Sequence, residues 1–310
     1  MSAPAGRSGL RGAAIAAAPV VFVLLWSTGF VGARYGLPYA EPFTFLALRL
    51  ALAGTLLAGL ALVTRSGRPA SRAQVGRAGI AGLLLHATYL GGVFFAISSG
   101  LPASVAAVVV SLQPVLTAAL ATRLLGERLV ALQWLGLALG VGGVALVLTP
   151  GLASAAGDEG AFPPVGVASC LVALLGGTAG TLWQKRHGDD IPLLSGTAVQ
   201  YAAAALVLVA VAGATETMAV RWTVEFIAAL VWLVVPLSIG AVLLLLLLLR
   251  RGSASGVSSL LYLVPPATAV EAYLLFGEEL PLLSLAGVLV TTVGVALVLR
   301  PPGRRARAAR

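Results

Sequence analysis

The chain repeats itself, and this repetition constrains its fold more than any other feature. When the sequence is shifted by 151 positions, residues 102–150 align with residues 253–301 without a gap. Of these 49 aligned pairs 20 are identical, and the run Val144–Leu148 recurs unchanged as Val295–Leu299. The chain therefore consists of two related halves, and both are almost wholly apolar.

The composition predicts a membrane protein. Hydrophobic residues make up 59% of the chain and charged residues only 10%, whereas a soluble domain carries about 25% charged residues. A transmembrane helix needs roughly 20 apolar residues, so the 310 residues can supply many of them. The single cysteine, Cys170, excludes an internal disulfide framework and a cysteine-based metal site.

Apolar windows separated by proline, glycine and charged residues predict an all-α polytopic membrane protein with ten transmembrane helices. The predicted spans are 13–33, 42–63, 76–97, 103–122, 129–149, 164–184, 192–212, 225–249, 254–276 and 281–299. The longest break, at 150–163, separates the halves. We therefore expect a first five-helix repeat over residues 1–150 and a second over residues 151–310, which ends in a short basic tail from Arg300.

The positive charges predict the orientation of the spans. If the N-terminus is cytoplasmic, 17 of the 20 Lys and Arg residues fall in cytoplasmic loops or termini. Arg34 and Arg221 lie on the other side, and Arg49 lies within a span. This split follows the positive-inside rule. It predicts a cell (inner or plasma) membrane protein with both termini in the cytoplasm. It also explains the net charge of +9 by membrane orientation, so the charge does not indicate a nucleic-acid partner.

The odd number of spans in each half has a topological consequence. Five spans return the chain to the opposite side, so the second half is expected to lie upside down relative to the first. Gly126-Glu127 and its copy Gly277-Glu278 would then lie on opposite sides of the membrane. Such inverted repeats around a central site are typical of secondary transporters that work by alternating access.

The N-terminus has a second interpretation. Arg7, Arg11 and the apolar run from Ala13 also resemble a signal peptide. The run is long for that purpose, and its removal would leave one half with four spans. We therefore expect it to form the first span.

The residues also resemble a known family. The segment WSTGFVGARYGLP, the element PVLTAALATRLLGER and its echo PPATAVEAYLLFGEE are similar to EamA-type members of the drug/metabolite transporter superfamily, and the likeness extends over the whole chain. The resemblance implies a bundle of ten helices, two inverted repeats and a central cavity. It also implies efflux of small metabolites, amino acids or drugs across the inner membrane. The segment GGTAGTLWQKRH departs from the pattern, because Trp183 is shifted relative to Trp26.

Ionisable residues inside the predicted spans are the first candidates for a substrate site, because a charge at the bilayer centre costs about 2.5–3.5 kcal/mol on insertion scales. Arg49 and Glu271 lie at similar depth in the outer half of their spans. We hypothesise that they face one cavity and either pair or bind a zwitterionic substrate. The alternative is that each snorkels separately to the interface. Glu271 is also the proton-coupling candidate, since its repeat counterpart is the uncharged Leu120.

Two further polar residues are cavity candidates. His86 and Tyr89 lie three residues apart and hence on one helical face. His86 can change charge near neutral pH; alternatively it is a neutral residue bonded to a neighbouring helix. Gln113 precedes Pro114 in the middle of a span.

Prolines are expected to bend two spans. Pro114 in span 4, and Pro265 with Pro266 in span 9, free backbone carbonyl groups near the midplane. Such irregular backbone either lines a cavity or serves packing. Tyr262 shares a face of span 9 with Pro266 and is a further cavity candidate, although small polar residues on that face also suit helix packing.

The remaining features are assigned mainly to structure. Trp26 lies midway along its span and is a cavity candidate, whereas Trp134 and Trp183 suit interface anchors. The spaced glycines of spans 5 and 10 suit close helix packing, and they permit a homodimer without requiring one. The two Gly-Glu turns are also interpreted as structural, with each Glu placed at the positive end of the helix that follows it.

The sequence contains no phosphate-binding glycine loop and no catalytic or metal-binding motif. We therefore expect a non-enzymatic secondary transporter or exporter without a cofactor, which moves a small metabolite, an amino acid or a related compound. Its energy would come from an ion gradient, with protons as one candidate, or from the substrate gradient itself. One alternative is a membrane scaffold or sensory subunit that does not transport. Another is an intramembrane enzyme, which would need a nucleophile and base that the sequence does not display.

Overall fold

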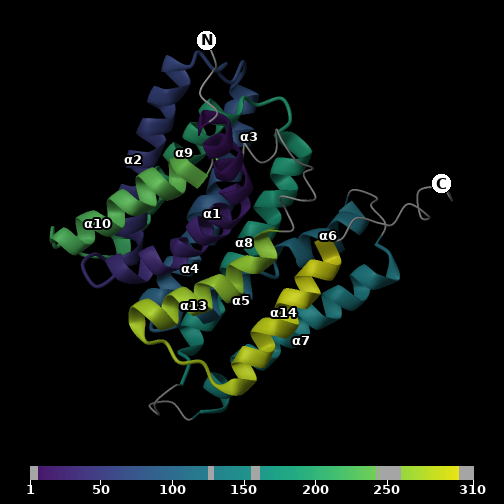
Figure 1. Ribbon diagram of the computed structural model, residues 1–310. Helices are drawn as coiled ribbons and strands as arrows, with labels where there is room; N and C mark the ends of the chain where they lie inside the picture. The colour runs from purple at the N-terminus through teal and green to yellow at the C-terminus, as the bar shows by residue number, and fades with distance from the viewer. Residues whose placement is uncertain (1–5, 125–128, 155–160, 242–243, 245–259, 300–310) are drawn as a thin grey trace, which may run out of the picture.

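The computed structural model describes residues 6–124, 129–154, 161–241, 244 and 260–299 (Figure 1). Within these ranges the regular structure is helical, apart from one isolated bridge between Ala40 and Val220. The predicted all-α class is therefore confirmed for the described residues.

Twelve α-helices are described. Their bounds are α1 Gly6–Gly36, α2 Pro42–Val63, α3 Arg72–Gly82, α4 Tyr89–Ser98, α5 Ala103–Val110, α6 Gln113–Leu124, α7 Ala131–Ala153, α8 Pro164–His187, α9 Leu193–Thr215, α10 Val224–Trp232, α13 Val264–Phe276 and α14 Leu282–Leu299. Three shorter segments continue them. They are the π-helical segments η1 Leu83–Thr88 and η2 Leu233–Gly240 and the 3-10 segment η3 Leu261–Leu263.

Eight helices among the described residues are long and apolar enough to cross a membrane. They correspond to eight of the ten predicted spans. The other two, 225–249 and 254–276, are described only in part, as the shorter apolar helix Val224–Gly240 and as η3 followed by α13. The chain is therefore a multi-pass membrane protein, and the count of ten spans stays a prediction.

Prolines and polar caps set several helix ends. Pro42 and Pro164 stand at the first position of α2 and α8, where proline's missing N–H costs no hydrogen bond. The Ser71 hydroxyl accepts a hydrogen bond from a backbone N–H in the first turn of α3. Gly277 ends α13 with a φ of 63°, a left-handed conformation that glycine adopts without strain.

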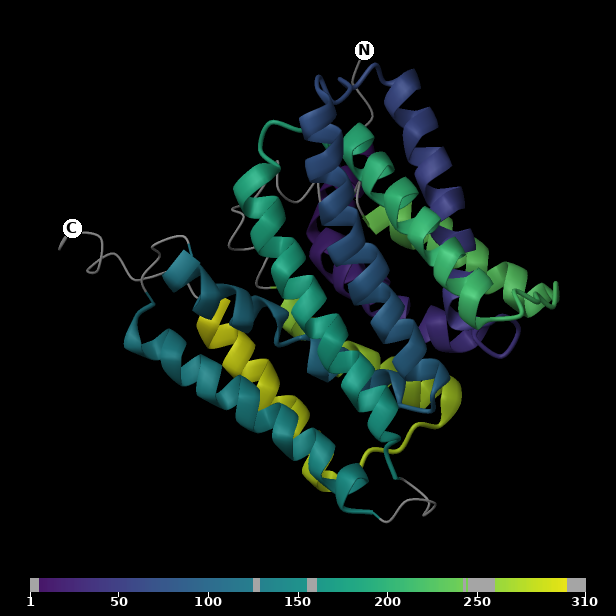
Figure 2. The ribbon, with the colours of Figure 1, turned by 180° about the vertical axis from the view of Figure 1, so that it is seen from behind.

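Helices α7 and α14 lie side by side at one edge of the molecule and run antiparallel (Figures 1 and 2). Their backbones approach so closely that a Cβ atom on Gly136 would lie 2.6 Å from the Gly294 carbonyl oxygen. A Cβ atom on Gly287 would likewise lie 2.6 Å from the Gly143 carbonyl oxygen. The expectation that these glycines serve close packing is confirmed for this helix pair.

Helices α2 and α9 form a second antiparallel pair. The Glu216 carboxylate accepts hydrogen bonds from the N–H groups of Phe43 (2.7 Å) and Thr44 (2.8 Å) and from the Thr44 hydroxyl (2.7 Å). Near the other end of the pair, the Ser195 hydroxyl donates to the Gly67 carbonyl oxygen at 2.6 Å. Polar contacts thus connect α2 and α9 at both ends. They fix the axial position of one helix along the other, which the apolar contact faces alone do not specify.

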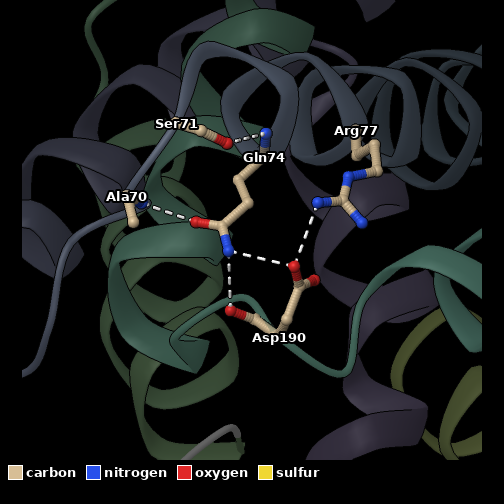
Figure 3. Close-up of polar contacts among 5 residues, drawn as sticks. All are labelled: Ala70, Ser71, Gln74, Arg77 and Asp190. Carbon is tan, nitrogen blue, oxygen red and sulfur yellow. Dashed lines mark hydrogen bonds and ion pairs between the residues drawn. The ribbon is translucent and has the colours of Figure 1, made fainter.

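A polar cluster joins the beginning of α3 to the connection between α8 and α9 (Figure 3). The Gln74 side-chain amide donates to the Asp190 carboxylate at 3.0 Å, and the Arg77 guanidinium donates to the same oxygen at 3.0 Å. Both contacts hold the pKa of Asp190 below its usual value, the Gln74 hydrogen bond most strongly. Asp190 is exposed, so this cluster positions a loop more than it stabilises the fold.

Candidate functional site

A cavity of about 340 Å³ lies among the helices. Its volume falls within the roughly 300–1,000 Å³ of small-molecule sites. The walls come from both halves of the chain, through α1, α2, η1, α4, α5 and α6 on one side and α9, η2, η3 and α13 on the other. Most of the lining side chains are apolar or aromatic.

Several of the candidate residues from the sequence line this cavity. They are Trp26, Arg49, His86, Tyr89, Gln113 and Pro114. The other candidates lie elsewhere: Glu271, Pro265 and Pro266 are not among the described lining residues. The side chain of Tyr262 is outside the described part of the chain.

Arg49 projects from α2 and is only 5% exposed. Its guanidinium carbon lies 6.0 Å from the centroid of the Phe94 ring. Its Nε atom is buried without a hydrogen-bond partner. A guanidinium group thus lies at the cavity wall with an aromatic neighbour and, among the described residues, without a carboxylate.

His86 is held by helix α9. Its Nε2 atom lies 3.2 Å from the Gln200 side-chain oxygen, and its ring meets the Tyr201 ring edge to face at a centroid distance of 4.6 Å. A neutral imidazole protonated at Nε2 satisfies this geometry, since it donates to the amide oxygen. His86 therefore lines the cavity and is bonded to a neighbouring helix, and its change of charge near neutral pH stays a prediction.

Gln113 connects the wall of the cavity to α8. Its side-chain amide donates to the Thr181 hydroxyl at 2.7 Å and to the Gly177 carbonyl oxygen at 3.2 Å. It begins α6 directly after a turn at Ser111–Leu112 that interrupts span 4, and Pro114 follows. The break exposes Ser111 to the cavity.

Glu271 on α13 contacts α1. Its Oε1 accepts a hydrogen bond from the Ser27 hydroxyl at 2.7 Å, while Oε2 is buried without a partner. Arg49 and Glu271 form no ion pair with each other among the described residues. The carboxyl group of Glu271 therefore lies between two helices in this conformation.

The turn that follows α13 is bonded to the start of α5. The Glu278 carboxylate accepts hydrogen bonds from the N–H groups of Ala103 (3.1 Å) and Ser104 (3.3 Å) and from the Ser104 hydroxyl (2.7 Å), and it forms an ion pair with Arg34. The expectation that Glu278 serves the following helix is wrong, because its acceptor groups satisfy the free N–H groups of α5 instead. Its structural role stands, and the copy at Glu127 lies outside the described residues.

Two tryptophans lie away from the cavity. The Trp183 indole N–H donates to the Arg77 carbonyl oxygen at 3.0 Å, and its ring packs against the His187 ring at a centroid distance of 4.2 Å and an interplanar angle of 34°. Trp134 is 51% exposed on α7. Their positions suit anchoring better than substrate contact.

The sequence profile of the EamA-like transporter family matches residues 12–149 and 165–300. The chain belongs to this family. It is a multi-pass membrane transporter of the EamA type, as the resemblance of its motifs indicates.

Relatives of this EamA-like transporter are themselves named as transporters. The uncharacterized transporter YvbV of Bacillus subtilis is 28% identical over 277 residues, which cover 89% of this chain and 88% of the relative. The uncharacterized inner membrane transporter YedA of Escherichia coli is 26% identical over 275 residues, which cover 89% and 87%. A solved crystal structure shares the fold with a TM-score of 0.63 at 20% identity, covering 92% of this chain and 97% of that one.

Sequence reasoning missed two features of the EamA-like site, Ser238 and the π-helical segments. Ser238 lines the cavity but is an ordinary polar residue of an apolar span in the sequence. Tyr201, an aromatic residue next to Gln200 that the sequence does offer as a cavity candidate, lines the cavity too. The π-helical segments η1 and η2 widen the helices that carry His86 and Ser238, and such segments are frequent at functional sites. Pro236, which lies within η2, was the sequence feature that could have indicated the irregular helix there. The sequence of η1 has no comparable feature.

Proposed function

We propose that this EamA-like protein is a secondary transporter that moves a small metabolite, an amino acid or a related compound, outward across the cell membrane by alternating access. The central cavity carries the proposal, because helices from both halves line it and polar groups face it. A scaffold or sensory subunit that does not transport has no need of a buried arginine at such a cavity. The family and the names of the relatives support the same function.

The packing of α7 against α14 supports two inverted repeats, over residues 1–150 and 151–310. Gly136 faces Gly294, and Gly143 faces Gly287. Under the shift of 151 positions, Gly136 corresponds to Gly287 and Gly143 to Gly294. Each glycine thus contacts the counterpart of the other, which is the reciprocal pattern of a two-fold axis. Two antiparallel helices related in this way are expected to cross the membrane in opposite directions.

The irregular segments recur at equivalent positions as well. Residues 83–88 of η1 correspond to residues 234–239 within η2, Leu233–Gly240. The break at Ser111–Leu112 corresponds to residues 262–263, at the end of η3. An exchange of conformations between the two halves requires irregular helical segments at equivalent positions, one in each half.

The orientation in the membrane can be tested by labelling. Arg128 and Glu279 are repeat counterparts and are expected on opposite sides, with both termini cytoplasmic. Cysteine is introduced at each position, and a membrane-impermeant thiol reagent is added to intact cells. Cys170 is buried and gives a low background. Labelling of both introduced cysteines from the same side contradicts the inverted arrangement.

Transport is tested by flux in proteoliposomes. The purified protein is supplied with a panel of labelled amino acids and related metabolites, with and without a pH gradient. Flux above that of protein-free liposomes is expected for at least one compound, and its absence across the panel contradicts the proposal. Glu271 is proposed as the proton-coupling group, so the Glu271→Gln variant is expected to lose the dependence of flux on the gradient. Full dependence in that variant excludes this role.

A further inference from the structure

Among the described residues, Arg49 has no anionic partner of the kind that a buried cation needs. The side chain is 5% exposed, its Nε atom has no hydrogen-bond partner, and its guanidinium carbon lies 6.0 Å from the centroid of the Phe94 ring. Removing an ion from water costs several kcal/mol unless an opposite charge and hydrogen bonds compensate. A cation–π contact of this length compensates for only a small part of that cost.

In the part of the chain that the structure describes, the cavity wall supplies no carboxylate for this cation. The described lining residues include no aspartate or glutamate. Glu271, the buried carboxylate of span 9, is bonded to Ser27 and is not among the described lining residues. A further carboxylate, Glu278, is occupied by Arg34 and the start of α5. The cavity wall therefore has a fixed positive charge in a mostly apolar and aromatic surrounding.

We propose that the cavity binds a small organic anion, a monocarboxylate with an aromatic or aliphatic body, and that Arg49 binds its carboxylate group. The inference rests on the proposed transport function and narrows its substrate class. A guanidinium group binds a carboxylate through two parallel hydrogen bonds, with the fixed fork geometry that Arg49 provides. Aromatic residues such as Trp26, Tyr89 and Phe94 supply an apolar surface for the body of the ligand.

The charge of the cavity distinguishes this class from amino acids. A zwitterion also brings an ammonium group, which would need an anionic or strongly accepting partner inside the cavity. The described walls offer it only neutral acceptors, namely the hydroxyl groups of two tyrosines and two serines, the His86 ring and the Gln113 amide oxygen, and no carboxylate. A monoanion neutralises Arg49 without adding a second unpaired charge, so it is the better match.

Binding of three probes that share a phenylethyl group tests the inference. Phenylpropanoate, phenylalanine and phenylethylamine differ chiefly in net charge, and their binding to the purified full-length protein is measured by titration calorimetry in detergent and in lipid nanodiscs. Phenylpropanoate is expected to bind at least about 10-fold more tightly than phenylalanine, since each tenfold step corresponds to about 1.4 kcal/mol. Phenylethylamine is expected not to bind. Inorganic phosphate and chloride are added as competitors, which separates carboxylate recognition from general anion binding.

Two variants and a matched control make the test specific to Arg49. Arg49→Gln is expected to weaken phenylpropanoate binding by about 100-fold, because it removes one partner of a buried charge pair. Arg68→Gln makes the same substitution at an exposed loop position and is expected to bind like the wild type. If Arg49→Gln does not fold, Arg49→Lys keeps the charge without the fork. It is expected to bind more weakly than the wild type but still to prefer the anion over the amine.

The outcomes separate this inference from the proposed function. Equal binding of the amine and the carboxylate, unchanged binding in Arg49→Gln, or no binding of phenylpropanoate and of a series of aliphatic monocarboxylates overturns the inference. Displacement by phosphate at equal concentration overturns carboxylate selectivity. Flux of a zwitterion or a cation together with any of these results leaves the transporter intact and removes only the substrate class. Binding of the carboxylate without any flux leaves the inferred ligand class intact and removes the proposed transport function.

Discussion

The glycine contact between α7 and α14 allows a quantitative prediction for a single methyl group. In Gly143→Ala the new Cβ would meet the Thr291 hydroxyl, and it would lie 2.5 Å from the Thr291 backbone nitrogen and 2.8 Å from the Gly287 carbonyl oxygen. These two backbone distances are about 0.9 Å and 0.6 Å short of the 3.4 Å at which ordinary van der Waals contact begins. The Thr291 hydroxyl can rotate away, but the two backbone atoms cannot. Separating or distorting two packed helices in this way costs about 1–3 kcal/mol.

The neighbouring Gly142→Ala is the matched control. Gly142 lies on the same helix, and a Cβ atom there would meet no other atom within 4 Å. Both substitutions gain about 0.5–1 kcal/mol from the higher helix propensity of alanine. That gain cancels in the comparison, so Gly143→Ala is expected to be less stable than Gly142→Ala by the steric term alone, about 1–3 kcal/mol.

The free energy of unfolding can be measured in mixed micelles by titration with a denaturing detergent, with helicity followed by circular dichroism. Because Gly294 is the repeat counterpart of Gly143, Gly294→Ala is expected to show the same loss. The double variant Gly143→Ala/Gly287→Ala is expected to be non-additive, since the two residues face each other. Equal stabilities of the Gly142 and Gly143 variants would refute the assignment of α7–α14 as a backbone contact.

Three further predictions concern the carboxylates at helix ends. Glu278→Ala removes the cap of α5 and the ion pair with Arg34, and it is expected to lower the free energy of unfolding by about 1–2 kcal/mol. The control is Glu279→Ala at the exposed neighbouring position, which is expected to change the free energy of unfolding little. Equal losses for the two variants in the same detergent titration contradict the capping role of Glu278. Glu216→Ala removes the acceptor of two N–H groups at the start of α2 and is expected to show a loss of similar size, visible as faster amide exchange in the first turn of α2. Since the pKa of Asp190 is lowered, its contact with Gln74 is present above the ordinary value near 3.8 and is lost only as the pH falls through the lower folded value. Flux of Asp190→Asn is therefore expected to follow the wild-type pH profile between about pH 5 and 8, and a shifted profile would assign Asp190 a role in coupling.

The sequence alone was sufficient to predict where most helices lie. The predicted starts at residues 42, 103 and 164 coincide with those of α2, α5 and α8. The reason is physical: in a bilayer an apolar run long enough to span must be helical, so length and hydropathy leave few alternatives. The two spans next to the undescribed residues 242–243 and 245–259 are the ones for which the prediction is not yet tested.

The site was less predictable, because it depends on which helices meet. Arg49, His86 and Gln113 were identifiable as polar residues in apolar spans, but not their neighbours: Gln200 for His86, and α8 for Gln113. Glu278 was assigned to the helix that follows it in sequence, whereas it caps α5, 174 residues away. Spacing along one helix indicates a shared face; it carries no information on the partner across a tertiary contact.

The two halves of the chain share residues that serve helix packing but differ at Arg49, which lines the cavity. Glycines at the helix contact, Pro114 with Pro265, and the π-helical segments recur at equivalent positions, whereas Arg49 corresponds to Gln200. Two conformations that exchange by swapping the roles of the halves need similar packing energies, since a gap of more than a few kcal/mol would leave one of them unpopulated. Repeated packing residues provide that balance. Recognition of one substrate has no such requirement, because the substrate itself has no two-fold symmetry. In a chain of this kind, we therefore expect the binding chemistry at the positions where the internal repeat is broken, and Arg49 at the cavity wall is such a position.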